Sequence, residues 1–251
     1  MKKILSKIAL LAVFTSSMVS CQKSQDVIPQ QAVGSVNSEN AINHSLTLSY
    51  LDSGINAMVH GLSSQQGLNF NGYPSFQATV WTYLGTPAPR RSLMKFGFQN
   101  VPASCTNATL VSAKLYLYQQ DETNTTGNYY SIQHVANDAE IRRITGNWNP
   151  ATVTWQNQPP TSGLASTNAN SKKAVAITDI TTPFTGSQDN QVIDVTEMVR
   201  TWLPGNNQQT NYGFEIRFPN GRETQFYKAR TYGSFTSTNV SVRPVLKLYW
   251  Q

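Results

Sequence analysis

The 251-residue sequence has little cysteine, and it has only one long apolar run. Its two cysteines are Cys21, at the end of that run, and Cys105. We therefore expect no disulfide within the chain that follows Cys21. No second stretch of about 20 apolar residues appears, so we expect no other membrane-spanning helix.

The chain also has little net basic charge once its first residues are set aside. The formal charge is +6, but residues 1–20 contain three lysines and no acid, which leaves +3. Nucleic-acid-binding proteins usually carry a dense basic patch. We therefore expect no nucleic-acid partner.

The motifs of common enzymes are missing as well. His44, His60 and His134 show no metal-ligand spacing with one another or with cysteine. Glycosidases usually need two placed carboxylates, but Asp121-Glu122 lies in a polar segment and Glu197 is placed to cap a helix. There is no Gly-Lys-Ser phosphate loop and no Gly-x-Ser-x-Gly motif. We expect no enzyme and no cofactor, although the Asn- and Asp-containing loops leave a structural Ca²⁺ open.

Residues 1–20 have the pattern of an export signal. Two lysines precede a mostly apolar run over Ile4–Val19, and small residues follow it. The ending Met18-Val19-Ser20-Cys21 resembles the lipobox of bacterial lipoproteins, which implies cleavage before Cys21 and acylation of its thiol. Each buried CH₂ contributes about 0.8 kcal/mol, so two or three acyl chains anchor a protein stably. The alternative is an ordinary signal peptide with an incidental cysteine.

Residues 21–45 are predicted to form the lipidated cysteine and a flexible tether. This stretch is rich in Gln, Ser and Asn and has no apolar period, so it cannot bury enough surface to order itself. The start of the tether, Gln22–Asp26, loosely resembles the signals that send some lipoproteins to the outer face of the cell. We expect lipid anchoring at the bacterial outer membrane with the protein exposed at the surface, and the periplasmic face remains an alternative.

Residues 46–251 are predicted to form one all-β domain. Ala113–Tyr118, Phe214–Phe218 and Leu246–Trp250 alternate apolar and polar residues, and Gly, Asn and Pro clusters separate such segments. This alternation indicates strands with one face on a core, and many such strands favour an antiparallel β-sandwich of the jelly-roll kind. The larger apolar side chains expected in the core are Phe96, Leu115, Leu117, Phe214, Ile216, Leu246 and Leu248.

One segment, Asp194–Leu203, has helical spacing instead. Its apolar residues are Val195, Met198, Val199 and Trp202. Asp194 is predicted to cap this helix, with Glu197 as the return partner, and Pro204-Gly205 ends it. We expect one short helix that closes an end of the sandwich.

Several motifs follow one another in a fixed order along the body of the chain. They are Arg91–Phe96, Ala108–Leu117, Trp148, Thr152–Asn157, Pro159, Asp194–Thr196, Trp202, Asn211–Phe214 and Arg243–Leu248. Together they resemble the DNRLRE domain, which is also classed as carbohydrate-binding module family 96. The resemblance implies a β-sandwich of surface and secreted proteins, sometimes found beside polysaccharide lyases, with alginate binding in some members. The chain departs from the family at Lys228-Ala229-Arg230, where a serine–acid pair is usual.

Cationic and aromatic residues recur at the solvent-facing positions of the expected strands. Arginine and lysine can pair with sugar carboxylates, and aromatic faces can lie against sugar rings. Lys114, Tyr118, Lys247 and Tyr249 belong to this set, and an ordinary solvated sheet face is the alternative. The residues that we predict to bind the ligand are Arg91, Lys95, Tyr116, Arg217, Lys228, Arg230 and Tyr232.

The Phe226–Tyr232 segment places a geometric condition on this site. Alternation puts Lys228, Arg230 and Tyr232 on one face together with Phe226. The hypothesis requires Lys228 and Arg230 to be solvent-accessible, because both would point inward if Phe226 were in the core. The three motif tryptophans are expected to be structural, with a role as sugar platforms as the alternative.

The leading hypothesis is therefore a surface-anchored, non-catalytic module whose partner is a polysaccharide or glycan, in particular an acidic one. The membrane would be reached through the lipid anchor only. A structural or adhesive cell-surface protein with protein partners is the main alternative. A polysaccharide lyase that uses His134, or a hydrolase, is a third.

Overall fold

The computed structural model describes residues 44–120, 139–162, 175–177, 190–219, 221–224 and 228–251, and every structural statement below concerns these residues. They belong to one unit, Asn40–Gln251. The predicted signal, Cys21, most of the tether, Asp121-Glu122, His134 and Phe226 lie outside the described residues. No helix in the described part of the chain is long and apolar enough to span a membrane.

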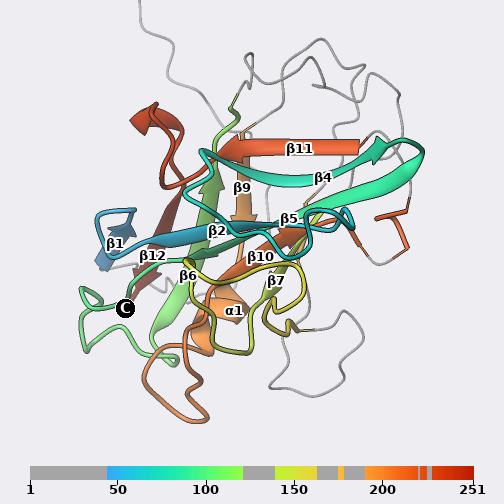
Figure 1. Ribbon diagram of the computed structural model, residues 1–251. Coiled ribbons are helices and arrows are strands. Elements are labelled where there is room, and N and C mark those ends of the chain that lie inside the picture. The colour runs from blue at the N-terminus through green and yellow to red at the C-terminus, as the bar shows by residue number, and fades with distance from the viewer. Residues whose placement is uncertain (1–43, 121–138, 163–174, 178–189, 220, 225–227) are drawn as a thin grey trace, which may run out of the picture. The chain divides into compact units, whose positions relative to one another are not determined.

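These residues form two antiparallel sheets and one short α-helix (Figure 1). The strands are β1 (His44–Leu48), β2 (Ile55–His60), β3 (Phe70–Asn71), β4 (Ser75–Tyr83), β5 (Thr86–Lys95), β6 (Leu110–Leu117), β7 (Ala139–Arg143), β8 (Val175–Ile177), β9 (Gln191–Asp194), β10 (Phe214–Arg217), β11 (Lys228–Gly233) and β12 (Val245–Trp250). The helix is α1 (Thr196–Arg200), and a 3₁₀ turn, η1 (Val240–Val242), precedes β12. The predicted all-β fold with one short helix is confirmed.

The two sheets differ in size and connectivity. The four-stranded sheet has the order β1-β12-β6-β9. The larger sheet has the order β11-β4-β5-β10-β7-β8, and β2 joins it by pairing with β5 on one side and with β3 on the other. β12, which lies near the C-terminus, therefore sits between β1 and β6.

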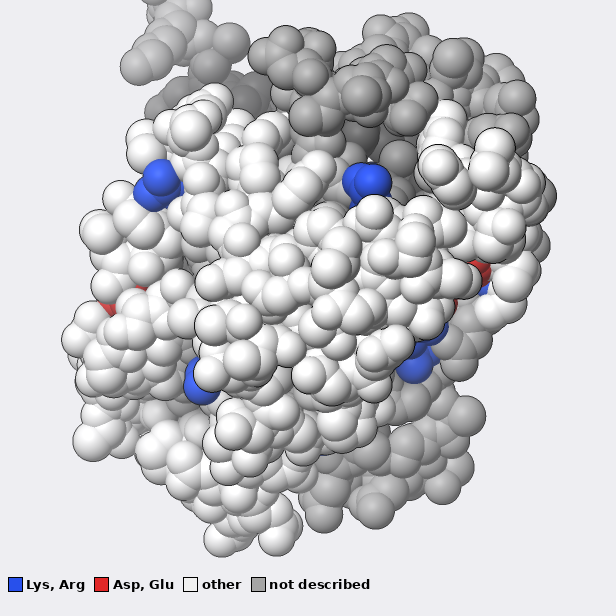
Figure 2. Space-filling model, in the orientation of Figure 1, with Lys and Arg blue, Asp and Glu red and all other residues white. Residues whose placement is uncertain are grey.

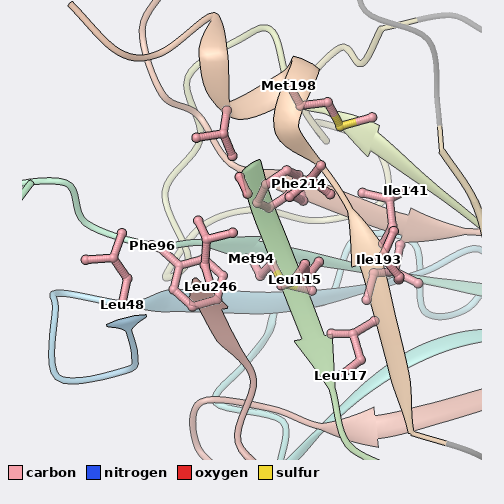
Figure 3. Close-up of a cluster of buried hydrophobic side chains, with 14 of the residues drawn as sticks. Leu48, Met94, Phe96, Leu115, Leu117, Ile141, Ile193, Met198, Phe214 and Leu246 are labelled. Atoms are coloured by element: carbon pink, nitrogen blue, oxygen red, sulfur yellow. The ribbon is translucent and has the colours of Figure 1, made fainter. Parts of the chain in front are cut away.

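The core forms from the apolar sides of both sheets, as the alternation predicts. In β6, Leu115 and Leu117 are buried, while Lys114 and Tyr116, which alternate with them, are half-buried. All seven large side chains predicted for the core are at most 1% exposed. Figure 3 shows this core, with Leu115, Leu117, Ile193 and Leu246 from the four-stranded sheet and Met94, Ile141 and Phe214 from the larger one. Truncating a buried leucine of this kind to alanine typically costs about 2–5 kcal/mol.

The helix is shorter than predicted, and its predicted capping box is wrong. No side chain caps α1. Asp194 is the last residue of β9, and its carboxylate accepts from the backbone N–H of Thr196 at 2.9 Å and from Lys114 Nζ at 2.7 Å. Glu197 forms an ion pair with Arg200 instead of turning back toward Asp194. The strand pairing of β9 with β6 thus holds Asp194 outside the helix.

The three motif tryptophans pack within the protein. Trp202 is 4% exposed, and its ring centroid lies 4.9 Å from that of Phe214 in the core. Trp148 and Trp155 cover a second apolar cluster on the other face of the larger sheet, and Trp148 Nε1 donates to the carbonyl oxygen of Tyr212 at 2.8 Å. The cluster contains Ala57, Val59, Leu93, Ile144 and Val153. These contacts support the structural interpretation of the tryptophans.

Candidate functional site

Two of the predicted ligand residues, Arg230 and Tyr232, are buried. In the β11–β4 pairing they lie opposite Ala78 and Phe76, which are core residues, so all four share the core-facing side. Arg230 is 1% exposed, Tyr232 is 0% exposed, and Arg230 Nη1 donates to the Tyr232 hydroxyl oxygen at 3.3 Å. The condition that Arg230 be solvent-accessible is therefore not met, because its position along β11 places its side chain on the face of the strand that packs on the core. The Lys228 side chain lies outside the described residues.

Arg91 is tied to neighbouring loops. Its guanidinium forms paired contacts with the Glu223 carboxylate, Nε to Oε1 at 2.8 Å and Nη2 to Oε2 at 2.6 Å. Its Nη1 donates to Gln158 Oε1 at 2.9 Å, and its Cζ lies 4.4 Å from the Trp155 ring centroid. Both members of the ion pair have side chains that are only 14% exposed. Arg91 thus fastens two loops to the larger sheet, and its charge is balanced there.

Arg217 lies in the same buried cluster. It is 6% exposed, and three carboxylates approach it: Glu223 at 3.1 Å, Glu215 at 3.5 Å and Glu140 at 3.8 Å. Glu140 also pairs with Arg142. Burial raises the pKa of Glu215, although the neighbouring arginines act in the opposite direction. Each carboxylate contacts an arginine, so this arrangement differs from the placed acid and base of a glycosidase.

The sequence interpretation missed four members of this cluster: Glu140, Arg142, Glu215 and Glu223. A signal was present for three of them. Glu140-x-Arg142 and Glu215-x-Arg217 place opposite charges two residues apart, which puts them on one face of a strand. Register then sets Arg142 opposite Glu215 and Glu140 opposite Arg217. Three arginines and three glutamates balance one another in this cluster.

Lys95 and Tyr116 lie on different sheets. Lys95 ends β5, pairs with Ile55 of β2 and is half-buried. Tyr116 lies on β6 of the four-stranded sheet. The seven predicted ligand residues therefore do not form one site.

The solvent-facing residues of β6 and β12 do come together. Lys114 lies opposite Lys247, and Tyr116 lies opposite Val245, in one antiparallel pair. Lys114, Tyr116, Lys247 and Tyr249 are all half-buried, whereas the leucines that alternate with them are fully buried. We call this surface the outer face of the four-stranded sheet, defined by Lys114, Tyr116, Tyr118, Asp194, Lys247 and Tyr249.

Aromatic and cationic groups lie next to one another on the outer face. Lys247 Nζ lies 4.7 Å from the ring centroid of Tyr116. The rings of Tyr116 and Tyr118 are 6.5 Å apart between centroids, and their planes differ by 22°. Burial, together with the neighbouring Tyr116, raises the pKa of Tyr118, so its hydroxyl remains protonated at neutral pH.

The outer face also contains one carboxylate. Partial burial of Asp194 opposes ionisation, but hydrogen bonds from Lys114 and Thr196 outweigh it and lower the pKa of Asp194 to about 2. Asp194 is therefore ionised at neutral pH. Its ion pair with Lys114 remains open to solvent, since the two side chains are 58% and 34% exposed.

On the face shown in Figure 2, the described lysine and arginine side chains do not gather into one basic patch. Lys and Arg side chains form separate spots there on a mostly uncharged surface. Among the residues that the structure describes, no group of three or more His, Cys, Asp or Glu residues is placed to hold a metal ion.

The sequence matches the family model of carbohydrate-binding module family 96 over residues 69–234. The chain belongs to this family. Its partner class is therefore a sugar or glycan. A comparison with curated proteins finds no match. Within this family-96 module, β6 with Tyr116 falls inside the matched region, whereas β12 with Lys247 follows it.

The outer face has the chemistry that a carbohydrate-binding module needs. Tyrosine presents an apolar ring and a polar hydroxyl, so it can contact both the C–H groups and the hydroxyl groups of a sugar. Lysine adds a point charge with three donors. Of the predicted ligand residues only Tyr116 belongs to this face, where Tyr118 and Lys247 are its aromatic and cationic neighbours.

Proposed function

We propose that this family-96 module is a surface-anchored, non-catalytic protein that binds a polysaccharide through the outer face of the four-stranded sheet. One observation carries the proposal. Lys247 of β12 lies over the ring of Tyr116 of β6, and the ring of Tyr118, the residue that follows the end of β6, lies 6.5 Å from that of Tyr116. Two aromatic rings and a cation are thus presented by two adjacent strands of one sheet and the residue that follows one of them.

The spacing along β6 favours an extended ligand. Residues two apart on a strand are separated by about 6.6 Å and project from the same face. The rings of Tyr116 in β6 and of Tyr118, which follows the end of β6, lie 6.5 Å apart, so they can contact neighbouring units of a polymer that runs in the direction of β6. The regular strand holds Tyr116 more rigidly than a loop would, which lowers the entropy lost on binding.

An acidic polysaccharide is the ligand class that Lys247 supports. Its ammonium is close to an aromatic ring and can pair with a sugar carboxylate at the same time. Exposed ion pairs are screened by salt, so binding should weaken as ionic strength rises. Alginate, which is charged on every sugar, is included among the probes because the sequence resembles modules of which some bind it, although this chain departs from them at Lys228-Ala229-Arg230.

The buried cluster around Arg217 supports a non-catalytic role. Its three glutamates contact arginines, and the cluster fastens loops to the sheet. We expect the protein to release no new reducing ends or unsaturated sugars from any polysaccharide that it binds.

The test is affinity electrophoresis and calorimetry with the full chain in detergent, using alginate, polygalacturonate, gellan and a neutral glucan. Tyr116→Ala, Tyr118→Ala and Lys247→Met should each weaken binding. The tyrosine variants should do so by roughly tenfold, a loss near the lower end of the about 1–3 kcal/mol found when an aromatic partner of a stacked nucleobase is replaced by alanine. Tyr83→Ala is the matched control, since Tyr83 is 59% exposed but lies at the end of β4 in the other sheet.

Two results would contradict the proposal. If Tyr116→Ala and Tyr118→Ala bind as tightly as the unaltered protein, the outer face is not the site. If no polysaccharide binds at all, the face is an ordinary solvated surface and the structural or adhesive role takes precedence.

A further inference from the structure

A row of charged side chains crosses the outer face from strand to strand. Register places Lys247 of β12 opposite Lys114 of β6, and Lys114 opposite Asp194 of β9. Directly opposite residues of antiparallel strands point to the same side. The three charged groups therefore share the surface that contains Tyr116.

Asp194 is held in a fixed position within this row. Its Oδ1 accepts from the backbone N–H of Thr196 at 2.9 Å and from the Thr196 hydroxyl at 2.6 Å. Its Oδ2 accepts from Lys114 Nζ at 2.7 Å. The carboxylate is thus fixed from the beginning of α1 and from β6, yet its side chain is 58% exposed.

The charges of the row do not add up to a strongly basic surface. Asp194 balances Lys114, so Lys247 is the ammonium left without a carboxylate contact among the described residues of this face. A polymer with a carboxylate on every sugar would bring one close to Asp194, and like charges on neighbouring groups repel. A polymer with widely spaced carboxylates can place one at Lys247 and a neutral sugar at the Lys114–Asp194 pair.

We infer that Asp194 is a specificity-determining residue that makes the module prefer polysaccharides whose acidic sugars are separated by neutral ones over polyuronates charged on every sugar. The inference rests on the proposed function, because it needs the outer face to be the binding site. The Lys114–Asp194 pair presents donors and acceptors side by side, which suits the hydroxyl groups of a neutral sugar. Asp194 acts by rejecting the wrong ligand as much as Lys247 acts by attracting the right one.

The probes are gellan, in which neutral sugars separate the uronic acids, and polygalacturonate, in which every sugar is acidic. The unaltered full chain should bind gellan more tightly at equal ionic strength. Asp194→Asn retains an oxygen that can accept from Thr196 but removes the negative charge. It should raise the affinity for polygalacturonate by about two- to fivefold, the range expected for an exposed charge interaction. The affinity for gellan should change less, so the ratio between the two polymers should fall.

Two further variants separate this effect from a change in net charge or stability. Glu197→Gln removes one negative charge from an ion pair on α1 whose carboxylate is equally exposed, at 58%. It should leave the ratio unchanged. Lys114→Gln leaves Asp194 without its cation and should lower the affinity for polygalacturonate, which is the opposite direction to Asp194→Asn.

The outcomes are distinct from those that test the binding face. If the unaltered protein prefers polygalacturonate, or if Asp194→Asn leaves the ratio unchanged while Tyr116→Ala weakens binding of both polymers, the role of Asp194 is wrong and the binding face stands. If Tyr116→Ala and Tyr118→Ala leave both affinities intact, the binding face itself is wrong.

Discussion

Arg91 of β5 and Glu223, which follows β10, meet as a paired guanidinium–carboxylate contact with both side chains only 14% exposed. This geometry is the strongest that an Arg–Glu pair adopts. The same guanidinium covers the Trp155 ring and binds Gln158. These contacts fasten the loops that carry Glu223 and Gln158 to β5, so Arg91 has a structural role.

Arg91→Ala should therefore destabilise the fold rather than abolish ligand binding. It leaves the Glu223 carboxylate largely buried without its main partner, and removal of one member of a buried pair costs about 3 kcal/mol. The free energy of unfolding in urea measures this change. Lys95→Ala, which removes a cation from the same strand, is the control and should cost less than about 1 kcal/mol. Equal losses in the two variants would contradict the fastening role.

Strands whose residues alternate between apolar and polar could be predicted from the sequence, because one of their faces is buried and the other is not. β12 follows this pattern along its whole length, and β6 follows it from Ala113 to Leu117. β2 does not, because five of its six residues are buried: the cluster beneath Trp148 and Trp155 covers Ala57 and Val59 on one side. A strand covered on both faces has no alternation to detect.

The site was harder to predict because alternation gives the side of a strand but not what covers that side. Alternation along β10 predicts that Arg217 faces solvent, but a loop carrying Glu223 covers that side of the strand and buries it. Arg91 and Glu223 are 132 residues apart in the chain, so nothing local indicates their pairing. Likewise, Tyr116 and Lys247 were both candidates for solvent-facing positions, but their contact depends on the pairing of β6 with β12.

The lipid anchor is predicted by the residues around Cys21, which lie outside the described part of the chain. Cys21→Ala removes the thiol that would be acylated, so the protein should carry no acyl chains and should be either soluble or left uncleaved. Metabolic labelling with a fatty acid and fractionation of the cells measure the effect. Cys105→Ala is the control, since Cys105 is buried in the core and should leave the labelling unchanged. Labelling that persists in Cys21→Ala would contradict the lipobox interpretation.

His60 should make stability fall as the solution becomes acidic. Burial, and then the positive charge of Arg90, lower the pKa of His60 from 6.5 to about 4. Between these two pH values the unfolded chain binds a proton that the folded protein does not, so stability decreases as pH falls from 6.5 toward 4. Unfolding midpoints in urea measured across this range should show the slope.

His60→Gln should flatten that slope because it removes the titrating group. The variant also loses the acceptor of the Leu62 backbone N–H, which contacts His60 Nδ1 at 3.2 Å, so its stability should be lower at neutral pH. The comparison therefore concerns the slope and not the absolute midpoint. His44→Gln, at the exposed start of β1, is the control and should leave the slope in place. An unchanged slope in His60→Gln would assign the effect to another group.

The turn between β4 and β5 contains a residue that is poorly suited to its backbone. Leu84 has φ 49° and Gly85 has φ 79°, and the flanking residues Tyr83 and Thr86 pair with each other. Two consecutive positive φ values define the type I′ hairpin turn, in which Asn-Gly is preferred. A leucine in the left-handed region costs about 1–2 kcal/mol more than its ordinary conformation, whereas asparagine adopts that region more readily. Leu84 is also 90% exposed, so its side chain offers little compensating burial.

Leu84→Asn should therefore stabilise the protein by about 1 kcal/mol, which corresponds to a rise in melting temperature of roughly 2–4 °C for a chain of this size. Thermal unfolding followed by circular dichroism measures the shift. Leu51→Asn makes the same chemical change at a site that is 76% exposed and is not among the described non-glycine residues with positive φ, so it should give no gain. If both variants gain equally, the benefit comes from removing an exposed leucine. If only Leu84→Asn gains, the backbone of the turn is the source.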